Sequence, residues 1–204
     1  MFTGIVAAIG RIVRVQPLGP GPDAGVRLVV DPADLDMSGV RIGDSIAMQG
    51  ACMTVTGFEA GGHFTVDVSR ESLRLTVGLA EPAEVNLEKA LSLGDALGGH
   101  LLTGHVDGLA RVLEFAPVGE SHRLVVRIPR EFGMYLAYKG SVAINGVSLT
   151  VNSVADGADG TDISMNLIPH TVAVTTLRRL QAGNDVNFEV DLIARYVQRM
   201  VTAR

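Results

Sequence analysis

The sequence predicts an all-β protein built from two similar antiparallel barrels and followed by a C-terminal α-helix. Three observations lead to this prediction. The chain repeats itself at an interval of about 100 residues, its apolar residues alternate with polar ones along short segments, and its last residues change to helical spacing. A chain of 204 residues is long enough for two compact domains, and its 24 glycines suit tight turns better than long helices.

The internal repeat predicts the domain organisation. Five pairs of segments match in an unbroken order: 1–12 with 101–112, 27–30 with 123–126, 45–55 with 141–151, 71–77 with 170–176, and 85–88 with 186–189. Units of this length are too long for a solenoid and suit a duplicated domain. We therefore expect one barrel at 1–97, a second at 98–190 and a separate helix at 191–204.

Alternation within each copy indicates half-buried strands. Phe64, Val66 and Val68 are separated by polar residues, and residues 123–128 repeat the pattern. Turn-forming residues separate such segments at hairpin-sized spacings, at 19–23, 59–62 and 156–160. Each copy should therefore close as a small antiparallel barrel.

The tail has the pattern of an amphipathic helix. Asp191 is placed to cap its N-terminus, and Arg195 falls on the polar face. The apolar face comprises Leu192, Ile193, Tyr196, Val197, Met200 and Val201. Because two closed barrels leave little room for this stripe, we expect it to pack on another subunit rather than on its own.

Composition excludes several classes of protein. The net charge is −5 with scattered basic residues, which gives no footprint for nucleic acid or an anionic membrane. One cysteine, Cys52, excludes an intrachain disulfide and a multi-cysteine metal site, and favours a reducing, cytoplasmic location. The first eleven residues, MFTGIVAAIGR, are expected to form a strand rather than a signal peptide, and no apolar run is long enough to predict a membrane span.

Six strings, in order, carry a resemblance to a known family: MFTGIV, QGACMTV, GGHLLTGHVDG, YKGSVAINGVSLTV, NLIPHTVAVTTL and VNFEVDLIARYV. The whole chain resembles riboflavin synthase of the α-chain type. The resemblance implies two six-stranded Greek-key barrels and a dismutation in which one 6,7-dimethyl-8-ribityllumazine donates a four-carbon unit to a second. It implies no cofactor, a homotrimer with each site shared between the barrels of two subunits, and a possible association with lumazine synthase.

The duplication suits this chemistry on physical grounds. A reaction between two identical molecules needs two similar pockets that face each other. Holding both reactants together replaces a bimolecular encounter with an effectively unimolecular one.

The resemblance also assigns site residues to two pockets. The first pocket would use Gly4, Ile5, Val6, Cys52, Met53, Thr54, Asp67, Val68, Ser69, Arg70, Glu71 and Ser72. The second would use Gly104, His105, Val106, Lys139, Ser148, Leu149, Thr150, Ile168, Pro169, His170, Thr171, Val172 and Ala173. Main-chain groups there can pair with a pteridine edge, and hydroxyl groups suit a ribityl chain.

Three of these residues are candidates for catalysis because they break the internal symmetry. Cys52 aligns with Ser148, so a soft nucleophile in one copy matches a hydroxyl in the other, and His105 replaces Ile5 and could shuttle a proton. Each has a plainer interpretation: Cys52 as a small buried residue, His105 as a satisfied polar residue. His100 is expected to point to the opposite strand face from His105, which argues against a shared metal site.

Smaller features leave two points open. Lys139 could be a solvated strand-end lysine. The resemblance leads us to expect asparagine at position 49, where this chain has glutamine, whereas the second copy keeps asparagine at Asn145.

The alternative function is a non-catalytic lumazine or flavin carrier with the same barrels. A redox flavoprotein and a serine hydrolase are disfavoured, because the chain has no nucleotide-binding domain and no G-x-S-x-G elbow.

Overall fold

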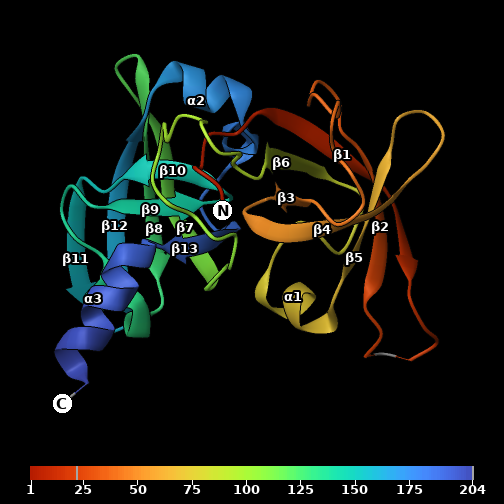
Figure 1. The fold of residues 1–204 in the computed structure, drawn as a ribbon. Helices are drawn as coiled ribbons and strands as arrows, with labels where there is room; N and C mark the ends of the chain where they lie inside the picture. Colours follow the sequence, from red (N-terminus) through yellow and green to blue (C-terminus); the bar gives the residue numbers. More distant parts are fainter. Residues whose placement is uncertain (22, 204) are drawn as a thin grey trace.

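The computed structural model describes residues 1–21 and 23–203 and places two β-barrels side by side (Figure 1). The turn predicted at 19–23 includes Pro22, and the predicted tail includes Arg204; both residues lie outside the described part. The predicted fold class is confirmed.

The first barrel closes with six antiparallel strands in the order β1-β2-β5-β4-β3-β6, which is a Greek key. Its elements are β1 (Ala8–Pro17), β2 (Val26–Asp31), β3 (Ser45–Met48), β4 (Ala51–Phe58), β5 (Phe64–Val68), α1 (Arg70–Leu75) and β6 (Glu84–Lys89). The alternating residues Phe64, Val66 and Val68 lie in its core as expected. Burying a side chain of this kind contributes about 1.5–3 kcal/mol.

The second barrel repeats this strand order with one change: the counterpart of β4 is divided in two. Its sheet order is β10-β9-β13-β7-β8-β12-β11. Its elements are β7 (Gly108–Val118), β8 (Ser121–Ile128), η1 (Arg130–Tyr135), β9 (Ser141–Ile144), β10 (Val147–Thr150), β11 (Ser153–Gly157), β12 (Gly160–Leu167), α2 (Pro169–Val174), η2 (Thr176–Arg179) and β13 (Asp185–Val190). The two edge strands of this sheet, β10 and β11, are consecutive in the chain and separated by only two residues. This short connection brings the two edges together and completes the barrel.

The barrels meet where two tight hairpin turns touch. Gln49 and Gly50 join β3 to β4, and Asn145 and Gly146 join β9 to β10, all four with positive φ between 49° and 87°. A Cβ on Gly50 would lie 2.7 Å from the Gly146 amide nitrogen. Glycine is therefore required on both sides, because backbone approaches backbone. Gln49 is thus a residue of the barrel junction, where its amide oxygen accepts from the Asn86 N–H at 2.9 Å.

Two buried asparagines, one from each copy, connect the barrels across these turns. The Asn86 side chain donates to the Asn145 carbonyl at 2.9 Å and accepts from the Thr176 N–H at 2.8 Å. Asn187 mirrors it, donating to the Gln49 carbonyl at 2.9 Å and accepting from the Val77 N–H at 2.7 Å. Both residues are at most 2% exposed, and the main-chain groups that they satisfy are buried or partly buried.

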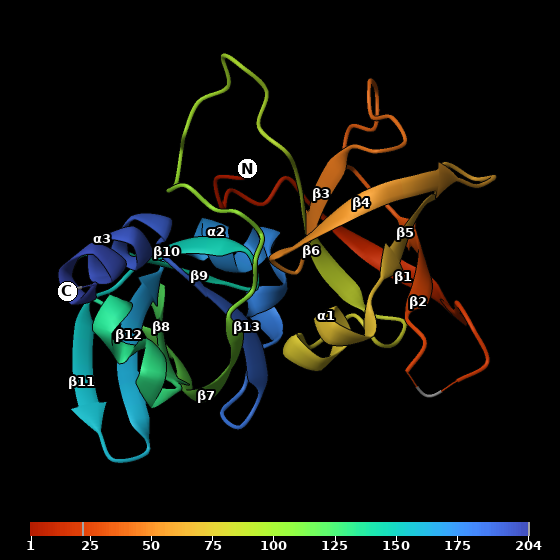
Figure 2. The ribbon, with the colours of Figure 1, turned by 60° about the horizontal axis from the view of Figure 1, so that its bottom comes forward.

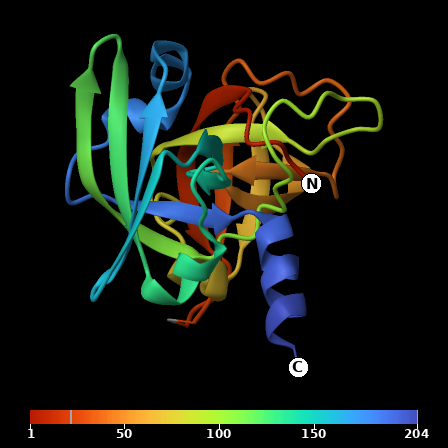
Figure 3. The ribbon, with the colours of Figure 1, turned by 90° about the vertical axis from the view of Figure 1, so that its left-hand side faces the viewer.

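The C-terminal helix α3 (Leu192–Thr202) begins after Asp191, whose carboxylate accepts from the Ile193 N–H at 2.9 Å, as predicted. It stands at the edge of the second barrel (Figure 3). Arg195 turns toward its own chain, where it pairs with Asp107 and lies over the Tyr135 ring. The apolar face is largely uncovered: Ile193, Tyr196, Val197, Met200 and Val201 are each at least 50% exposed. Within the described residues, no helix is long and apolar enough to cross a membrane.

The junction predicts a large effect of Asn187→Ala. The substitution removes the partners of one buried and one partly buried main-chain group, and a buried group left unsatisfied costs about 1–3 kcal/mol. The free energy of unfolding, measured in urea, should fall by about 2–4 kcal/mol. Asn166→Ala, at an exposed position of β12, should change it by less than about 0.5 kcal/mol. A loss below about 1 kcal/mol for Asn187→Ala would show that the junction adapts without its asparagine.

Candidate functional site

The two copies exchange their N-terminal segments. The segment 1–7 reaches the second barrel through Gly4 and Val6, and the segment 101–107 reaches the first through Gly104 and Val106. The two segments pair where Phe2 donates to the Leu102 carbonyl at 2.8 Å. Val6 packs on the core of the second barrel, and Val106 packs on the core of the first. The N-terminal segment, in red, passes between the barrels in Figure 2.

Each exchanged segment contacts a candidate catalytic residue of the other barrel, Cys52 in the first or Ser148 in the second. Cys52 donates its N–H to the Gly104 carbonyl at 2.8 Å, and Ser148 donates to the Gly4 carbonyl at 2.9 Å. Both glycines have a φ of +76°, and a Cβ on Gly104 would lie 2.7 Å from the Cys52 Cβ. Close approach and left-handed backbone explain the glycine of both T-G-x-V strings.

This exchange corrects the expected grouping of the pockets. The sequence assigned Gly4, Ile5 and Val6 to the Cys52 pocket and Gly104, His105 and Val106 to the Ser148 pocket. The structure places the glycine of each segment against the opposite residue. The physical reason is that the two segments run side by side between the barrels, where Phe2 pairs with Leu102, so the glycine carbonyl of each segment faces the opposite barrel. Alignment of the two copies cannot reveal such an exchange, because it is symmetric.

A small hollow surrounds Cys52. It has a volume of about 170 Å³ and is lined by Ala51, Cys52, Met53, Glu71, Ser72, Leu75, Thr76, Gly104, His105 and Val106. The helix α1 contributes Glu71, Ser72 and Leu75 to the hollow. Its first turn is capped by Ser69, whose hydroxyl accepts from the Ser72 N–H at 3.0 Å. Cys52 is half-buried and His105 is exposed. The two candidate catalytic residues Cys52 and His105 are thus brought together, although the sequence assigned them to different pockets.

Ser148 has a partner that the sequence reasoning missed. Its hydroxyl lies 2.7 Å from His100 Nδ1, and His100 is buried, with Nε2 lacking any hydrogen-bond partner in the described part of the chain. Burial lowers the pKa of His100 below its ordinary value of 6.5, and the Asp191 carboxylate opposes that shift. His100 and His105 lie in the segment 90–107 between β6 and β7, not in a strand, and they approach different residues, Ser148 and Cys52. The sequence feature that could have drawn attention to His100 is its position directly after the Gly98-Gly99 pair.

Several predicted site residues turn their side chains elsewhere. Met53, Val68 and Leu149 lie in the barrel cores, so they can offer a pocket little beyond main-chain groups. Asp67 accepts from Arg27 at 2.7 and 2.8 Å on the outer barrel face, and this hydrogen-bonded pair lowers the pKa of the carboxyl. Glu71 is paired with Arg74 in the same way at 2.7 Å, at the rim of the Cys52 hollow.

The remaining predictions fall around the second barrel. Lys139 is exposed, has a φ of +63° and reaches Asn152 Oδ1 at 3.2 Å. The region 168–173 forms the start of α2, which lies beside β10 in both Figure 1 and Figure 2. In the internal repeat, α2 is the counterpart of α1, and Ser148 is the counterpart of Cys52. Contact of these residues with a substrate stays a prediction.

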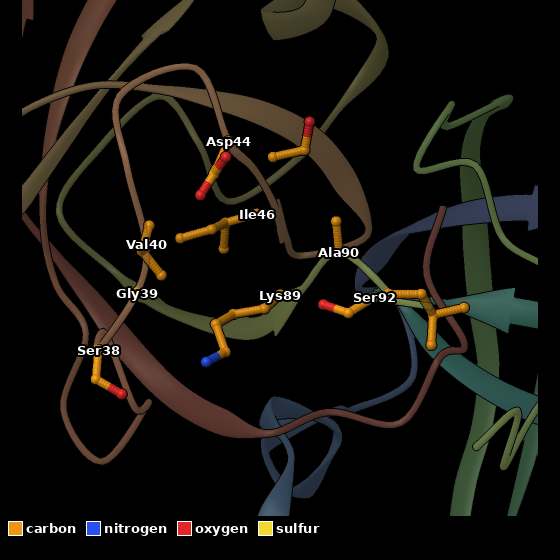
Figure 4. Close-up of a pocket in the computed structure, with 10 residues that line it drawn as sticks. Ser38, Gly39, Val40, Asp44, Ile46, Lys89, Ala90 and Ser92 are labelled. Carbon is orange, nitrogen blue, oxygen red and sulfur yellow. The ribbon is translucent and has the colours of Figure 1, made fainter. Parts of the chain in front are cut away.

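A separate cavity of about 400 Å³ lies at one end of the first barrel (Figure 4). Lys89, Asp44 and Ser92 surround it, together with the loop that carries Val40. None of the predicted site residues lines it. Ile46, which also lines this cavity, pairs across β3 and β4 with Met53, the neighbour of Cys52.

Comparison with known proteins agrees with the duplicated geometry. The family model for the lumazine binding domain matches twice, at residues 3–90 and 103–191. The chain is 40% identical over 206 residues to riboflavin synthase of Brucella abortus (strain 2308), covering 98% of both chains. The chain belongs to the riboflavin synthase family.

Further relatives extend this family assignment. The riboflavin synthase of Photobacterium phosphoreum is 41% identical, with 98% of this chain and 89% of that one covered. Among solved structures, LumP complexed with 6,7-dimethyl-8-(1'-D-ribityl) lumazine superposes with a TM-score of 0.77 at 27% identity, over 93% of this chain and 99% of LumP. The family assignment therefore rests on both sequence and fold.

The depressed pKa of His100 predicts a pH-dependent stability. The unfolded chain takes up a proton near pH 6.5, whereas folded His100 does so at lower pH, so stability is lost as pH falls below about 6.5. His100→Asn keeps a hydrogen-bonding group near Ser148 but cannot be protonated. The difference in unfolding free energy between wild type and variant should shrink from pH 7.5 to 5, by at most about 1.4 kcal/mol per pH unit. A constant difference across that range would contradict the assigned burial.

Proposed function

We propose that the chain catalyses the riboflavin synthase reaction: two molecules of 6,7-dimethyl-8-ribityllumazine give riboflavin and 5-amino-6-(D-ribitylamino)uracil by transfer of a four-carbon unit. One observation carries the proposal. The Cys52 and Ser148 positions are built by the same exchange of T-G-x-V segments, and two equivalent pockets suit two identical substrate molecules. The LumP structure, a relative in fold, holds this same lumazine.

The chemical differences between the pockets suit unlike donor and acceptor roles. The Cys52 side offers a thiol beside the exposed imidazole of His105. The Ser148 side offers a hydroxyl 2.7 Å from a buried imidazole, with Ile5 in the place of His105. A thiolate is a strong nucleophile toward an electrophilic ring carbon, whereas a hydroxyl bound to a neutral histidine can give up or accept a proton.

The residues around these groups would bind and orient the substrates. The main-chain groups of 4 and 104 and the N–H groups of 5 and 105 are already hydrogen-bonded within the chain, so the carbonyls of 5 and 105 and the main-chain groups of 6 and 106 would pair with the pteridine edge. The hydroxyls of Thr54, Ser72 and Thr150 suit the ribityl chain. Lys139 would add a positive charge at the rim of the second barrel. In this proposal the reaction proceeds with protein side chains alone, without metal or nucleotide.

The alternative is a non-catalytic lumazine or flavin carrier. LumP supports it, since the same fold holds a lumazine in that protein. The enzyme is favoured because this chain is 40% identical to a riboflavin synthase and carries Cys52, His105 and Ser148 together. A turnover assay separates the two functions.

We further propose a homotrimer in which the first barrel of one subunit faces the second barrel of its neighbour. The Cys52 hollow, about 170 Å³, is smaller than the roughly 300 Å³ of ordinary ligand pockets, so a neighbouring surface would complete it. The uncovered apolar face of α3 supplies the contact that such an assembly needs. A cytoplasmic location and an association with lumazine synthase complete the proposal.

The turnover test uses purified protein without added metal or nucleotide. It should convert the lumazine to riboflavin and the pyrimidine in a one-to-one ratio. Cys52→Ser changes the side chain little in size but removes the sulfur nucleophile, and should lower the single-turnover rate more than about threefold while riboflavin still binds. Tight lumazine binding without any riboflavin formation would identify a carrier instead.

The assembly test changes the apolar face of α3. Val197→Glu places a charge in the stripe, and removal of residues 192–204 deletes it; both should give smaller particles by sedimentation and poor turnover. Arg199→Gln, an exposed polar position of the same helix, serves as the matched control. If Val197→Glu keeps the wild-type sedimentation coefficient and normal turnover, the helix does not hold the subunits together.

A further inference from the structure

Two buried carboxylates lie behind the exchanged segments, outside the groups assigned to substrate or catalysis. Glu88 on β6 and Glu189 on β13 are 8% and 5% exposed. Neither forms an ion pair in the described part of the chain, and neither lines the Cys52 hollow. A carboxylate can stay ionised in a buried position only if hydrogen bonds or an oppositely charged partner compensate for the lost contact with water.

Each carboxylate collects three donors from one exchanged segment. Glu189 Oε1 accepts from the Thr103 N–H at 2.8 Å and from the Thr103 hydroxyl at 2.7 Å, and its Oε2 accepts from the Gly104 N–H at 3.0 Å. Glu88 makes the same three contacts with Thr3 and Gly4, at 2.7, 2.7 and 3.0 Å. The repetition of all three contacts in both copies indicates a shared purpose.

The chain of contacts continues from each carboxylate to the pocket of the other barrel. The Thr103 hydroxyl, which donates to Glu189, accepts from the His105 N–H at 3.3 Å. The Gly104 carbonyl then accepts from the Cys52 N–H at 2.8 Å. Glu189 belongs to the second barrel, yet its contacts end at Cys52 in the first. Glu88 likewise reaches Ser148 through Gly4.

We propose that Glu189 and Glu88 are positioning residues: Glu189 holds His105 and Gly104 on the Cys52 pocket, and Glu88 holds Ile5 and Gly4 on the Ser148 pocket. Each acts through its own T-G segment and touches no substrate. A carboxylate is needed because both of its oxygens only accept, which matches three converging donors. The side-chain amide of glutamine would direct an NH2 group at one of these donors.

The assignment makes the two carboxylates act on opposite pockets, and the single cysteine of the chain reports on one of them. Loss of Glu189 should uncover Cys52, whereas loss of Glu88 should not. The consequence for turnover rests on the proposed function, but the consequence for Cys52 does not.

The experiment measures the alkylation rate of Cys52 by iodoacetamide in the intact protein. Glu189→Gln should raise the rate about three- to tenfold, because residues 103–106 open more often. Glu88→Gln, the matched control, should leave the rate within about 1.5-fold of wild type. A purely structural role would destabilise both variants in urea without this selectivity. Equal rates in the two variants, or a larger rise in Glu88→Gln, would overturn the assignment.

A second pair of variants keeps the test decisive if Glu189→Gln folds poorly. Thr103→Val is nearly isosteric and removes the hydroxyl that links Glu189 to the His105 N–H, and Thr3→Val is its counterpart in the other copy. Thr103→Val should raise Cys52 alkylation about two- to fivefold and Thr3→Val should not. No difference between them would also overturn the proposal.

Riboflavin protection separates failure of this proposal from failure of the proposed function. Riboflavin should slow alkylation of Cys52 in the wild type and in Glu88→Gln, and protection should need at least about fivefold more riboflavin in Glu189→Gln. If riboflavin protects Cys52 in none of these proteins, the assigned ligand pocket is wrong, whereas the ligand-free rates still decide the role of Glu189.

Discussion

The contact between two hairpin turns, backbone against backbone, is the constraint on which the rest of this structure depends. Gly50 and Gly146 approach so closely that neither could carry a side chain, and Asn86 and Asn187 satisfy the main-chain groups that this contact buries. Such a junction has little freedom to slide, because buried hydrogen bonds are lost as soon as the turns separate. The two barrels therefore hold one fixed relation.

That fixed relation allows the exchange of the T-G-x-V segments. Because the barrels cannot move apart, the segment of one copy can be pressed on Cys52 or Ser148 of the other with no tolerance for a Cβ. The Cys52 hollow is thus lined by residues from both copies, and Gly4 lies against Ser148 in the same way.

Small departures from symmetry on this scaffold are sufficient to make the pockets chemically different. The thiol of Cys52 matches the hydroxyl of Ser148, and His105 matches Ile5. The buried His100 adds a further difference, since it lies beside Ser148 at 2.7 Å. Equal geometry with unequal chemistry is what a reaction between two identical molecules in unlike roles requires.

The sequence by itself determined the duplication, the strand pattern, the capped C-terminal helix and the family. These follow from local periodicity and from strings such as the T-G-x-V pair, which are readable without knowing what touches what. Only the tertiary structure decided which segment serves which pocket, since a symmetric exchange leaves the alignment of Gly4 with Gly104 unchanged. It also decided the roles of Gln49, His100, Glu88 and Glu189, because burial and long-range hydrogen bonds join residues far apart in the chain, and no local pattern encodes them.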